Sequence, residues 1–182
     1  DNGICAIIDC DGNPQPLYNY IAQNQLKPTH ILLTHGHFDH IGAVEAVKEK
    51  YGCKVYAAEK EAALLADPAL NASDMASVPL RIYADVSVKN ADTISVGDLQ
   101  FSVLETPGHT QGSVCFLIEK NIFSGDTLFL GSCGRTDFPT GDYQTILSSL
   151  QKLKNLEGDY VVYPGHGPAT SLDYERKTNP FM

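Results

Sequence analysis

Residues 35–40 read His-Gly-His-Phe-Asp-His and place four side chains that can bind a metal ion within six positions. His35 and His37 are two residues apart, so in an extended segment both imidazoles can leave the chain on the same side and bind one ion. Asp39 and His40 follow where the chain turns into a helix, and this change of direction can bring them to a second ion. Binuclear metal sites hold their ions about 3.5 to 4 Å apart. The spacing therefore predicts that one short segment contributes ligands to two metal ions.

Three further side chains of the same chemistry lie in turns or at a strand end. His109 and His166 each follow a glycine, in the stretches Pro-Gly-His-Thr and Pro-Gly-His-Gly. A histidine in such a turn is poorly placed to fill a core, and loops on a rigid scaffold often carry function. Asp126 follows the short stretch 122–125, which is typical of a strand, so we expect its carboxylate at a strand end.

These residues can complete two metal sites. We expect His109 to give the first ion a third nitrogen ligand, and His166 to join Asp39 and His40 on the second ion. Asp126 can bridge the two ions through its two carboxylate oxygens. The predicted ligands are His35, His37, Asp39, His40, His109, Asp126 and His166. Imidazole and carboxylate ligands favour zinc, so we expect two Zn²⁺ ions, although iron and manganese are also accepted in either site.

The expected coordination leaves room for a water on the metal, which marks a catalytic rather than a structural site. Metal binding can lower the pKa of such a water from about 15.7 to about 7, which gives a metal-bound hydroxide at neutral pH. Asp39, which can shuttle a proton, and the bridging Asp126 are the candidate catalytic residues. A single Gly-His turn is more often structural than ligating, but the ordered set of ligands favours metal binding.

Composition limits the classes of protein and partner. A chain of 182 residues, 43% of them hydrophobic, can bury a sizeable core, so we expect one domain over residues 1–182. The formal net charge of −9 opposes nucleic-acid binding, which needs a basic face. No long apolar run and no signal peptide are visible, so we expect no membrane partner and a cytoplasmic location. The chain lacks a starting Met and enters a strand almost at once, which favours an N-terminus trimmed before Asp1.

Short apolar runs bounded by Gly, Pro, Asn or Asp predict several strands. The predicted strands are 4–8, 31–33, 53–58, 99–104, 113–118, 121–123 and 160–163, with hairpin turns at 97–98 and 120–121. Helices are expected from Asp39-His40 to a C-cap at Gly52, over 59–66 and over 143–156. Hairpins mixed with strand–helix units predict an α/β domain in which helices cover sheets. His30, which precedes a strand, is assigned a structural role.

Four motifs of the sequence resemble the ligand motifs of the metallo-β-lactamase-fold hydrolases. They are THGHFDHIG (34–42), PGHTQG (107–112), SGDTL (124–128) and PGHGP (164–168). The resemblance covers nearly the whole chain and implies the family's αββα four-layer sandwich, with a binuclear site at one edge of two packed sheets. Segments 134–138 and 174–181 are similar to those of small bacterial type II glyoxalases, the hydroxyacylglutathione hydrolases. The resemblance therefore implies a glyoxalase II-like enzyme.

We expect the metal-bound hydroxide to hydrolyse a thioester, such as S-lactoylglutathione or a related acyl-thiol. A thiol leaves readily because its pKa is about 8.5, whereas an amide nitrogen must be protonated, and no dedicated acid is evident. The expected partner is a small anionic molecule, and Arg135, Arg176 and Lys177 are candidates to bind its carboxylate. For Arg135, the alternative interpretation is a structural ion pair with Asp137.

Three alternative functions remain open from the sequence. The segment 134–138 also resembles persulfide dioxygenases, which share the fold and use a single iron. Lactonase or phosphodiesterase activity is a second alternative, because loops change the substrate while the fold stays the same. A non-catalytic metal-binding protein is the third, and the complete set of ligands argues against it.

Overall fold

The computed structural model describes residues 3–76 and 78–182. Asp1 and Asn2, on which the expected trimming of the N-terminus bears, lie outside the described residues. The chain divides into two compact units, of which the first comprises residues 1–88 and 94–100 and the second residues 89–93 and 101–182. The single domain expected over residues 1–182 stays a prediction. Within the described ranges, no helix is both long and apolar enough to cross a membrane.

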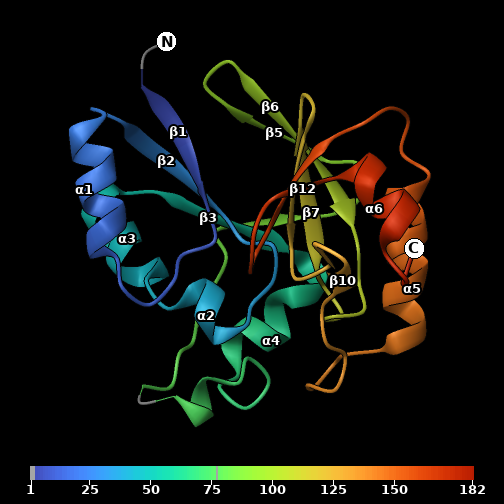
Figure 1. Ribbon diagram of the computed structural model, residues 1–182. Coiled ribbons are helices and arrows are strands. Elements are labelled where there is room, and N and C mark those ends of the chain that lie inside the picture. Colours follow the sequence, from blue (N-terminus) through green and yellow to red (C-terminus); the bar gives the residue numbers. More distant parts are fainter. Residues whose placement is uncertain (1–2, 77) are drawn as a thin grey trace. The chain divides into compact units, whose positions relative to one another are not determined.

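The first unit is built on a parallel sheet of four strands in the order β1-β2-β3-β4. These strands are β1 (Ile4–Ile8), β2 (Lys27–Leu32), β3 (Lys54–Ala58) and β4 (Val86–Val88). The helices are α1 (Gln15–Gln23), α2 (Phe38–Ile41), α3 (Val44–Tyr51) and α4 (Ala62–Ala66), with 3-10 turns η1 (Glu59–Glu61) and η2 (Ser73–Met75). Helices α1 and α3 lie against one face of this sheet (Figure 1), as expected where crossover connections join parallel strands.

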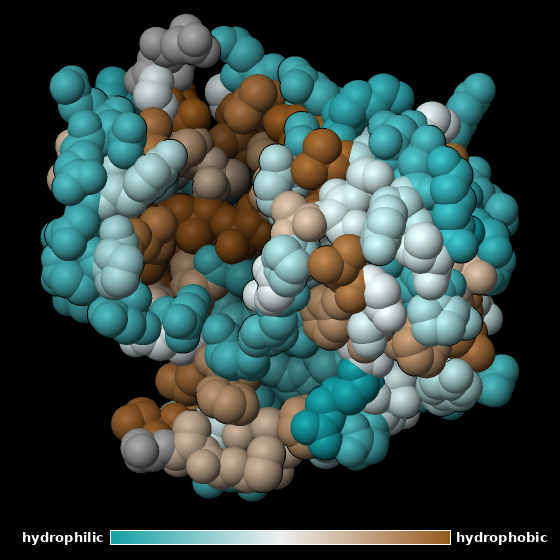
Figure 2. Space-filling model, in the orientation of Figure 1, coloured by the Kyte–Doolittle hydropathy of each residue, from teal (hydrophilic) through white to brown (hydrophobic). Residues whose placement is uncertain are grey.

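The core of the first unit lies between its sheet and these two helices. Ile21 of α1 and Val44 and Val47 of α3 belong to one apolar cluster with Ile31 and Val55 of the central strands. Near-continuous apolar runs, rather than alternating ones, are typical of parallel strands buried in this way. Strand β1 and the loop after it line a cavity of about 460 Å³ with α1. Figure 2 shows apolar surface, in brown, in the hollow beside that helix.

A second sheet has six strands in the order β12-β11-β8-β7-β6-β5. These strands are β5 (Thr93–Val96), β6 (Leu99–Glu105), β7 (Val114–Ile118), β8 (Asn121–Gly125), β11 (Val161–Pro164) and β12 (Thr170–Ser171). Strands β9 (Leu128–Phe129) and β10 (Ser132–Cys133) form a separate pair. Helices α5 (Tyr143–Lys154) and α6 (Leu172–Thr178) lie beside one face of the six-stranded sheet (Figure 1). Leu150 and Leu153 of α5 pack there with Val162 of β11.

Helix α5 follows the prediction for 143–156 closely because its signals are local. The carboxylate of Asp142 accepts a hydrogen bond from the N–H of Thr145 at 2.7 Å, which caps the N-terminus. Ile146, Leu150 and Leu153 are buried on one face. The same helix also packs against the turn that carries the predicted ligand His109.

Two predicted boundaries are wrong by a few residues. Strand β2 begins at Lys27 rather than at residue 31, and it accommodates Pro28 through a register shift that leaves Thr29 without a partner in β1. The second hairpin turns at residues 119–120 rather than 120–121, because Asn121 already pairs with Ile118 in the ladder. The first hairpin turns at 97–98 as predicted.

The single helix expected to start at the HGHFDH segment is two helices, α2 and α3. The N–H of Cys10 donates to the carbonyl of His40 at 2.7 Å, and the N–H of Ala43 donates to the carbonyl of Cys10 at 3.1 Å. These bonds take the place of helical bonds, so the loop after β1 interrupts the helix. A Cβ on Gly42 would lie 2.6 Å from the Cα of Gly12, so the close approach of the two segments requires glycine.

Candidate metal centre

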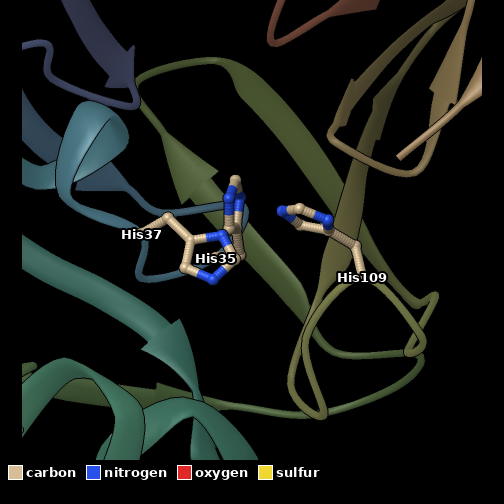
Figure 3. A group of neighbouring side chains, drawn as sticks. All are labelled: His35, His37 and His109. Carbon is tan, nitrogen blue, oxygen red and sulfur yellow. The ribbon is translucent and has the colours of Figure 1, made fainter. Parts of the chain in front are cut away.

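The first unit carries four of the predicted ligands, His35, His37, Asp39 and His40, which we call the first ligand set. His35 and His37 lie on the loop that follows β2 (Figure 3), and Asp39 and His40 lie in the first turn of α2. The ring centroids of His35 and His37 are 4.9 Å apart, and those of His35 and His40 are 4.1 Å apart. The first unit by itself therefore brings these imidazoles together.

Asp9 orients the imidazole of His40. It follows β1, and its Oδ2 accepts a hydrogen bond from Nδ1 of His40 at 2.8 Å. With the carboxylate as acceptor, Nδ1 carries the proton and Nε2 of the neutral ring carries the lone pair. That Nε2 lies 3.8 Å from Oδ2 of Asp39. A histidine held in this way by a second carboxylate is typical of metal ligands.

The same carboxylate fixes His35 through Thr34. The N–H and the hydroxyl of Thr34 donate to the two oxygens of Asp9 at 2.8 and 2.7 Å. Because the single hydroxyl proton is given to Asp9, the hydroxyl oxygen accepts from Nδ1 of His35 at 3.1 Å. His35 therefore also carries its lone pair on Nε2. One carboxylate thus sets the tautomers of two histidines in the first ligand set.

The second unit carries His109, Asp126 and His166, which we call the second ligand set. Asp126 and His166 follow the neighbouring parallel strands β8 and β11, where Pro164 lies opposite Gly125. The carboxyl ends of parallel strands meet at the same edge of a sheet, so the two side chains come together. Nε2 of His166 lies 3.5 Å from Oδ2 of Asp126. The prediction that Asp126 lies at a strand end is confirmed.

His109 lies on the turn that follows β6 (Figure 3). Its Nδ1 is 2.7 Å from the carbonyl oxygen of Arg135, an atom that can only accept a hydrogen bond. Nδ1 therefore carries the proton, and Nε2 of the neutral ring carries the lone pair. That Nε2 lies 3.6 Å from the same Oδ2 of Asp126 that faces His166. The carboxylate of Asp126 is thus shared between two imidazoles of the second unit.

Two glycines allow the backbone to approach closely enough for this arrangement. Gly108 has a positive φ of 133°, and a Cβ there would lie 2.2 Å from a backbone nitrogen of α5. A Cβ on Gly134 would lie 1.9 Å from the carbonyl oxygen of Asp126 and 3.1 Å from Nδ1 of His109. Glycine at position 134 therefore lets the next carbonyl, that of Arg135, reach His109.

The chemistry of both ligand sets fits a metal ion. The side chains of His35, His37, His40 and His109 are between 1% and 4% exposed, so they present their nitrogens away from bulk water. Imidazole lone pairs that face carboxylate oxygens repel them unless a cation lies between. Among residues 3–76 and 78–182, the groups of His, Cys, Asp and Glu that could hold a metal ion are formed from the seven predicted ligands. Nitrogen and carboxylate ligands of this kind suit zinc, iron or manganese.

Arg135 forms the ion pair with Asp137 that was the alternative to a role in substrate binding. Two nitrogens of its guanidinium donate to the two carboxylate oxygens of Asp137, each at 2.6 Å. These hydrogen bonds lower the pKa of Asp137 to about 2. The guanidinium also lies 4.0 Å from the ring centre of Phe138. Arg135 thus serves His109 through its backbone, while its side chain is held by its neighbours.

The other two candidates for substrate binding lie on α6. The guanidinium of Arg176 donates to the carbonyls of Lys154, Leu156 and Gly158 and to the carboxylate of Asp173. These bonds satisfy carbonyl groups at and beyond the C-terminus of α5, which argues against a role for Arg176 in binding substrate. Lys177 is exposed, and its contact with substrate stays a prediction.

Sequence reasoning missed Asp9, which the structure places behind two ligands. The available signal was its position directly after the apolar strand 4–8, the same pattern that identified Asp126. His30, by contrast, was assigned to structure, and its ring stacks on that of Tyr56 with centroids 4.9 Å apart. Burial lowers the pKa of His30, so it is suited to pack as a neutral ring.

Comparison with known proteins agrees with this chemistry. Residues 1–166 match the family model described as the metallo-β-lactamase superfamily. The chain belongs to this superfamily. It is 40% identical to the probable metallo-hydrolase YqgX of Bacillus subtilis, over 98% of this chain and 87% of that protein. It is 34% identical to the hydroxyacylglutathione hydrolase GloC of Haemophilus influenzae, over 100% of this chain and 89% of that protein.

Solved structures of this superfamily have the same fold. The B3 metallo-β-lactamase BLEG-1 matches with a TM-score of 0.93 and 41% identity, over 100% of this chain and 90% of that chain. The di-iron-bound TTHA1623 matches with a TM-score of 0.85 and 37% identity, over 96% and 88% of the two chains. ETHE1 from Myxococcus xanthus matches with a TM-score of 0.80 and 32% identity, over 96% and 72%. The predicted metallo-β-lactamase fold is confirmed, and the chain groups with the metallo-hydrolases of the superfamily.

Proposed function

We propose that the chain hydrolyses a small anionic thioester, such as S-lactoylglutathione or a related acyl-thiol, with the help of bound metal ions. The observation that carries the proposal is the contact that Nδ1 of His35, His40 and His109 each makes with a neighbouring oxygen. With these oxygens as acceptors, Nε2 of each ring is left to bind a metal ion. Such outer contacts set the ring orientation and raise the basicity of metal-binding histidines. The similarity to GloC, a hydroxyacylglutathione hydrolase, over the whole chain supports this substrate class.

We further propose that the two ligand sets act together on two metal ions, since the family model spans both sets. In this proposal, as in the prediction from the sequence, His35, His37 and His109 would bind one ion. Asp39, His40 and His166 would bind the other, and Asp126 would be shared between the two. When bound, such ions lower the pKa of a water to about 7 and polarise the carbonyl of the substrate. Zinc is the proposed metal, and the di-iron form of TTHA1623 makes iron the first alternative to measure.

The protein side chains have defined tasks in this proposal. Oδ2 of Asp126 lies 3.6 Å from Nε2 of His109 and 3.5 Å from Nε2 of His166, so the carboxylate can share a metal ion with these rings. The side chain of Asp39 is 36% exposed, so it can accept a proton from the attacking water and pass it to solvent. The leaving thiol, with a pKa of about 8.5, departs as a thiolate without a dedicated acid. Cleavage of a thioester therefore needs no proton donor for the leaving group, whereas cleavage of an amide does.

An activity panel on purified protein of measured metal content tests the proposal. The substrates are a thioester, a lactone, a β-lactam, a phosphodiester and a glutathione persulfide. We expect the thioester to be cleaved fastest, with thiol release that stops on chelation and returns when Zn²⁺ is restored. Fully metal-loaded protein that turns over another substrate but not the thioester would rule the proposal out.

The second candidate is an iron-dependent persulfide dioxygenase, which the similarity to ETHE1 favours. This reaction needs one iron and consumes oxygen, whereas thioester hydrolysis needs neither. Measuring the metal content and the oxygen uptake of the same preparation separates the two. One iron per chain with oxygen uptake on the persulfide favours the dioxygenase, and two ions without oxygen uptake favour the hydrolase.

A further inference from the structure

Glu61 is a buried carboxylate in the first unit that has no part in the reaction proposed above. It lies in η1, directly after β3, and it is 0% exposed. Its Oε1 accepts a hydrogen bond from the backbone N–H of Gly36 at 2.9 Å. Gly36 is the residue between the predicted ligands His35 and His37. The bond therefore holds the middle of the HGH loop from inside the unit.

Packing holds the same point of the loop. A Cβ on Gly36 would lie 2.7 Å from a methyl carbon of Leu64 and 2.8 Å from a methyl carbon of Leu65. Both leucines are buried in α4. The loop thus rests directly on this helix, with the carboxylate of Glu61 as a polar attachment and the two leucines as an apolar one. Glycine has no side chain of its own to anchor, so these contacts set the position of the loop.

The chemistry of the hydrogen bond favours a positioning role. A carboxylate buried in this way is costly unless strong hydrogen bonds satisfy it. A bond from a backbone N–H to a charged acceptor is shorter and stronger than the neutral equivalent. The backbone of Gly36 leads into His35 on one side and His37 on the other, so a shift at this amide moves both imidazoles.

We propose that Glu61 is a positioning residue for metal binding, which fixes His35 and His37 relative to each other by holding the Gly36 amide. The inference rests on the metal-binding role of the first ligand set given under the proposed function. Failure of that role would be seen in the wild-type protein, which would then bind no metal. If Glu61 does not position His35 and His37, the wild-type protein will still bind metal, and the Glu61 variants will bind it equally well.

Glu175 of the second unit provides a matched control. It is also a carboxylate with 0% exposure. Its oxygens accept hydrogen bonds from the N–H of Gly131 at 2.8 Å, from the hydroxyl of Thr170 at 2.6 Å and from the amide of Asn179 at 2.8 Å. None of these donors is the immediate neighbour of a predicted ligand in the sequence, as Gly36 is. The change in melting temperature on replacing Glu175 therefore measures the loss of stability that follows from losing a buried carboxylate.

The test compares Zn²⁺ affinity by chelator competition, the absorption spectrum of the Co²⁺-loaded protein and the melting temperature of the metal-free protein. Glu61→Asp keeps the charge but shortens the reach, and Glu61→Ala removes both. We expect each to lower the Zn²⁺ affinity about 10- to 100-fold and to change the Co²⁺ spectrum. Glu61→Gln keeps the reach and an acceptor oxygen, so it should lose less affinity than either. Glu175→Gln should lower the melting temperature while Zn²⁺ affinity and the Co²⁺ spectrum stay those of wild type.

Two results would overturn the inference. The first is wild-type affinity and a wild-type Co²⁺ spectrum in Glu61→Asp and Glu61→Ala. The second is a loss in Glu61→Gln that equals or exceeds the loss in Glu61→Asp, because charge rather than reach would then govern metal binding. If Glu61→Ala does not fold, the order of the other two Glu61 variants decides the question.

Discussion

Asp9 and His40 are joined by a hydrogen bond of 2.8 Å between Oδ2 and Nδ1, although they are 31 residues apart in the chain. The bond leaves Nε2 of His40 as the nitrogen that would bind a metal ion, and it ties this predicted ligand to the loop after β1. The same carboxylate reaches His35 through Thr34. The segment that follows β1 thus helps to orient the rings of His35 and His40 in the first ligand set.

Replacing Asp9 should therefore weaken metal binding without removing a ligand. In Asp9→Ala, Thr34 and His40 both lose their acceptor, and we expect metal affinity or activity to fall about 10- to 100-fold. Chelator competition measures the affinity directly. The control is Asp11→Ala, because Asp11 is exposed and its carboxylate accepts a local hydrogen bond from the N–H of Gly12. Equal effects in the two variants would contradict the role given to Asp9.

Removal of a ligand should be distinguishable from removal of a structural histidine. His35→Ala deletes a ligand of the first set, and we expect bound metal and turnover to fall together to background. His30→Ala removes a ring that stacks on Tyr56, so bound metal and turnover should stay near wild type while thermal stability falls slightly. Metal analysis and thiol-release assays on both proteins make the comparison. A His30→Ala protein as inactive and metal-poor as His35→Ala would contradict the assignment.

Gly134→Ala should disturb the second ligand set through the backbone. The added Cβ would lie 1.9 Å from the carbonyl oxygen of Asp126, so the chain must shift and the Arg135 carbonyl must leave His109. We expect a loss of stability of about 1–3 kcal/mol, as for other overpacked sites, together with weaker metal binding. Gly131→Ala is the control, since it has a positive φ of 65° but open space for a Cβ. That variant should lose stability but keep its metal affinity.

The ion pair between Arg135 and Asp137 should make the stability of the folded protein depend on pH in the acid range. The pKa of Asp137 is lowered from 3.8 to about 2 in the folded protein. Because this pKa is lowered, the ion pair stabilises the folded state above pH 3.8. The stabilisation is lost as the pH falls through about 2. In Arg135→Ala the pKa of Asp137 should return towards 3.8, as followed by NMR titration of its carboxyl carbon. An unchanged titration would show that Arg135 is not the cause.

Variants of the same ion pair test whether the side chain of Arg135 binds substrate. If its side chain serves Asp137 alone, Arg135→Ala and Asp137→Asn should change the KM for the thioester equally little. The backbone carbonyl that holds His109 is retained in both variants, so kcat should also be preserved. A large rise in KM in Arg135→Ala alone would restore the predicted contact with the substrate carboxylate.

The seven predicted ligands can be proposed from the sequence because each belongs to a recognisable local pattern. The HGHFDH segment, the two Pro-Gly-His turns and Asp126 at a strand end can each be found without knowing the fold. Asp9 and Glu61 could not be found in the same way, because each acts on a residue that is distant in the chain. A single Asp or Glu near an apolar run is too common to indicate such a contact.

Helix α5 and the longer strands were predictable for a similar reason, whereas two other helices and the short strands β4, β9, β10 and β12 were not. Helix α1 begins among prolines and has no side-chain cap at its N-terminus, so the polar signal that marks the start of α5 is missing. Helix α6 buries only Leu172 and Glu175, and a buried glutamate is the opposite of an amphipathic signal. Both helices depend on tertiary packing rather than on their own sequence pattern.

The position of Cys10 in the break between α2 and α3 has a consequence for thiol chemistry. Its backbone bonds to His40 and Ala43, its side chain is 3% exposed, and burial, with a smaller effect of Asp9, raises its pKa to about 12. Because the thiolate is the reactive form, alkylation of Cys10 should be slow while the fold around it stays closed. The rate at which a reagent alkylates Cys10 therefore reports how often the first unit opens around this residue.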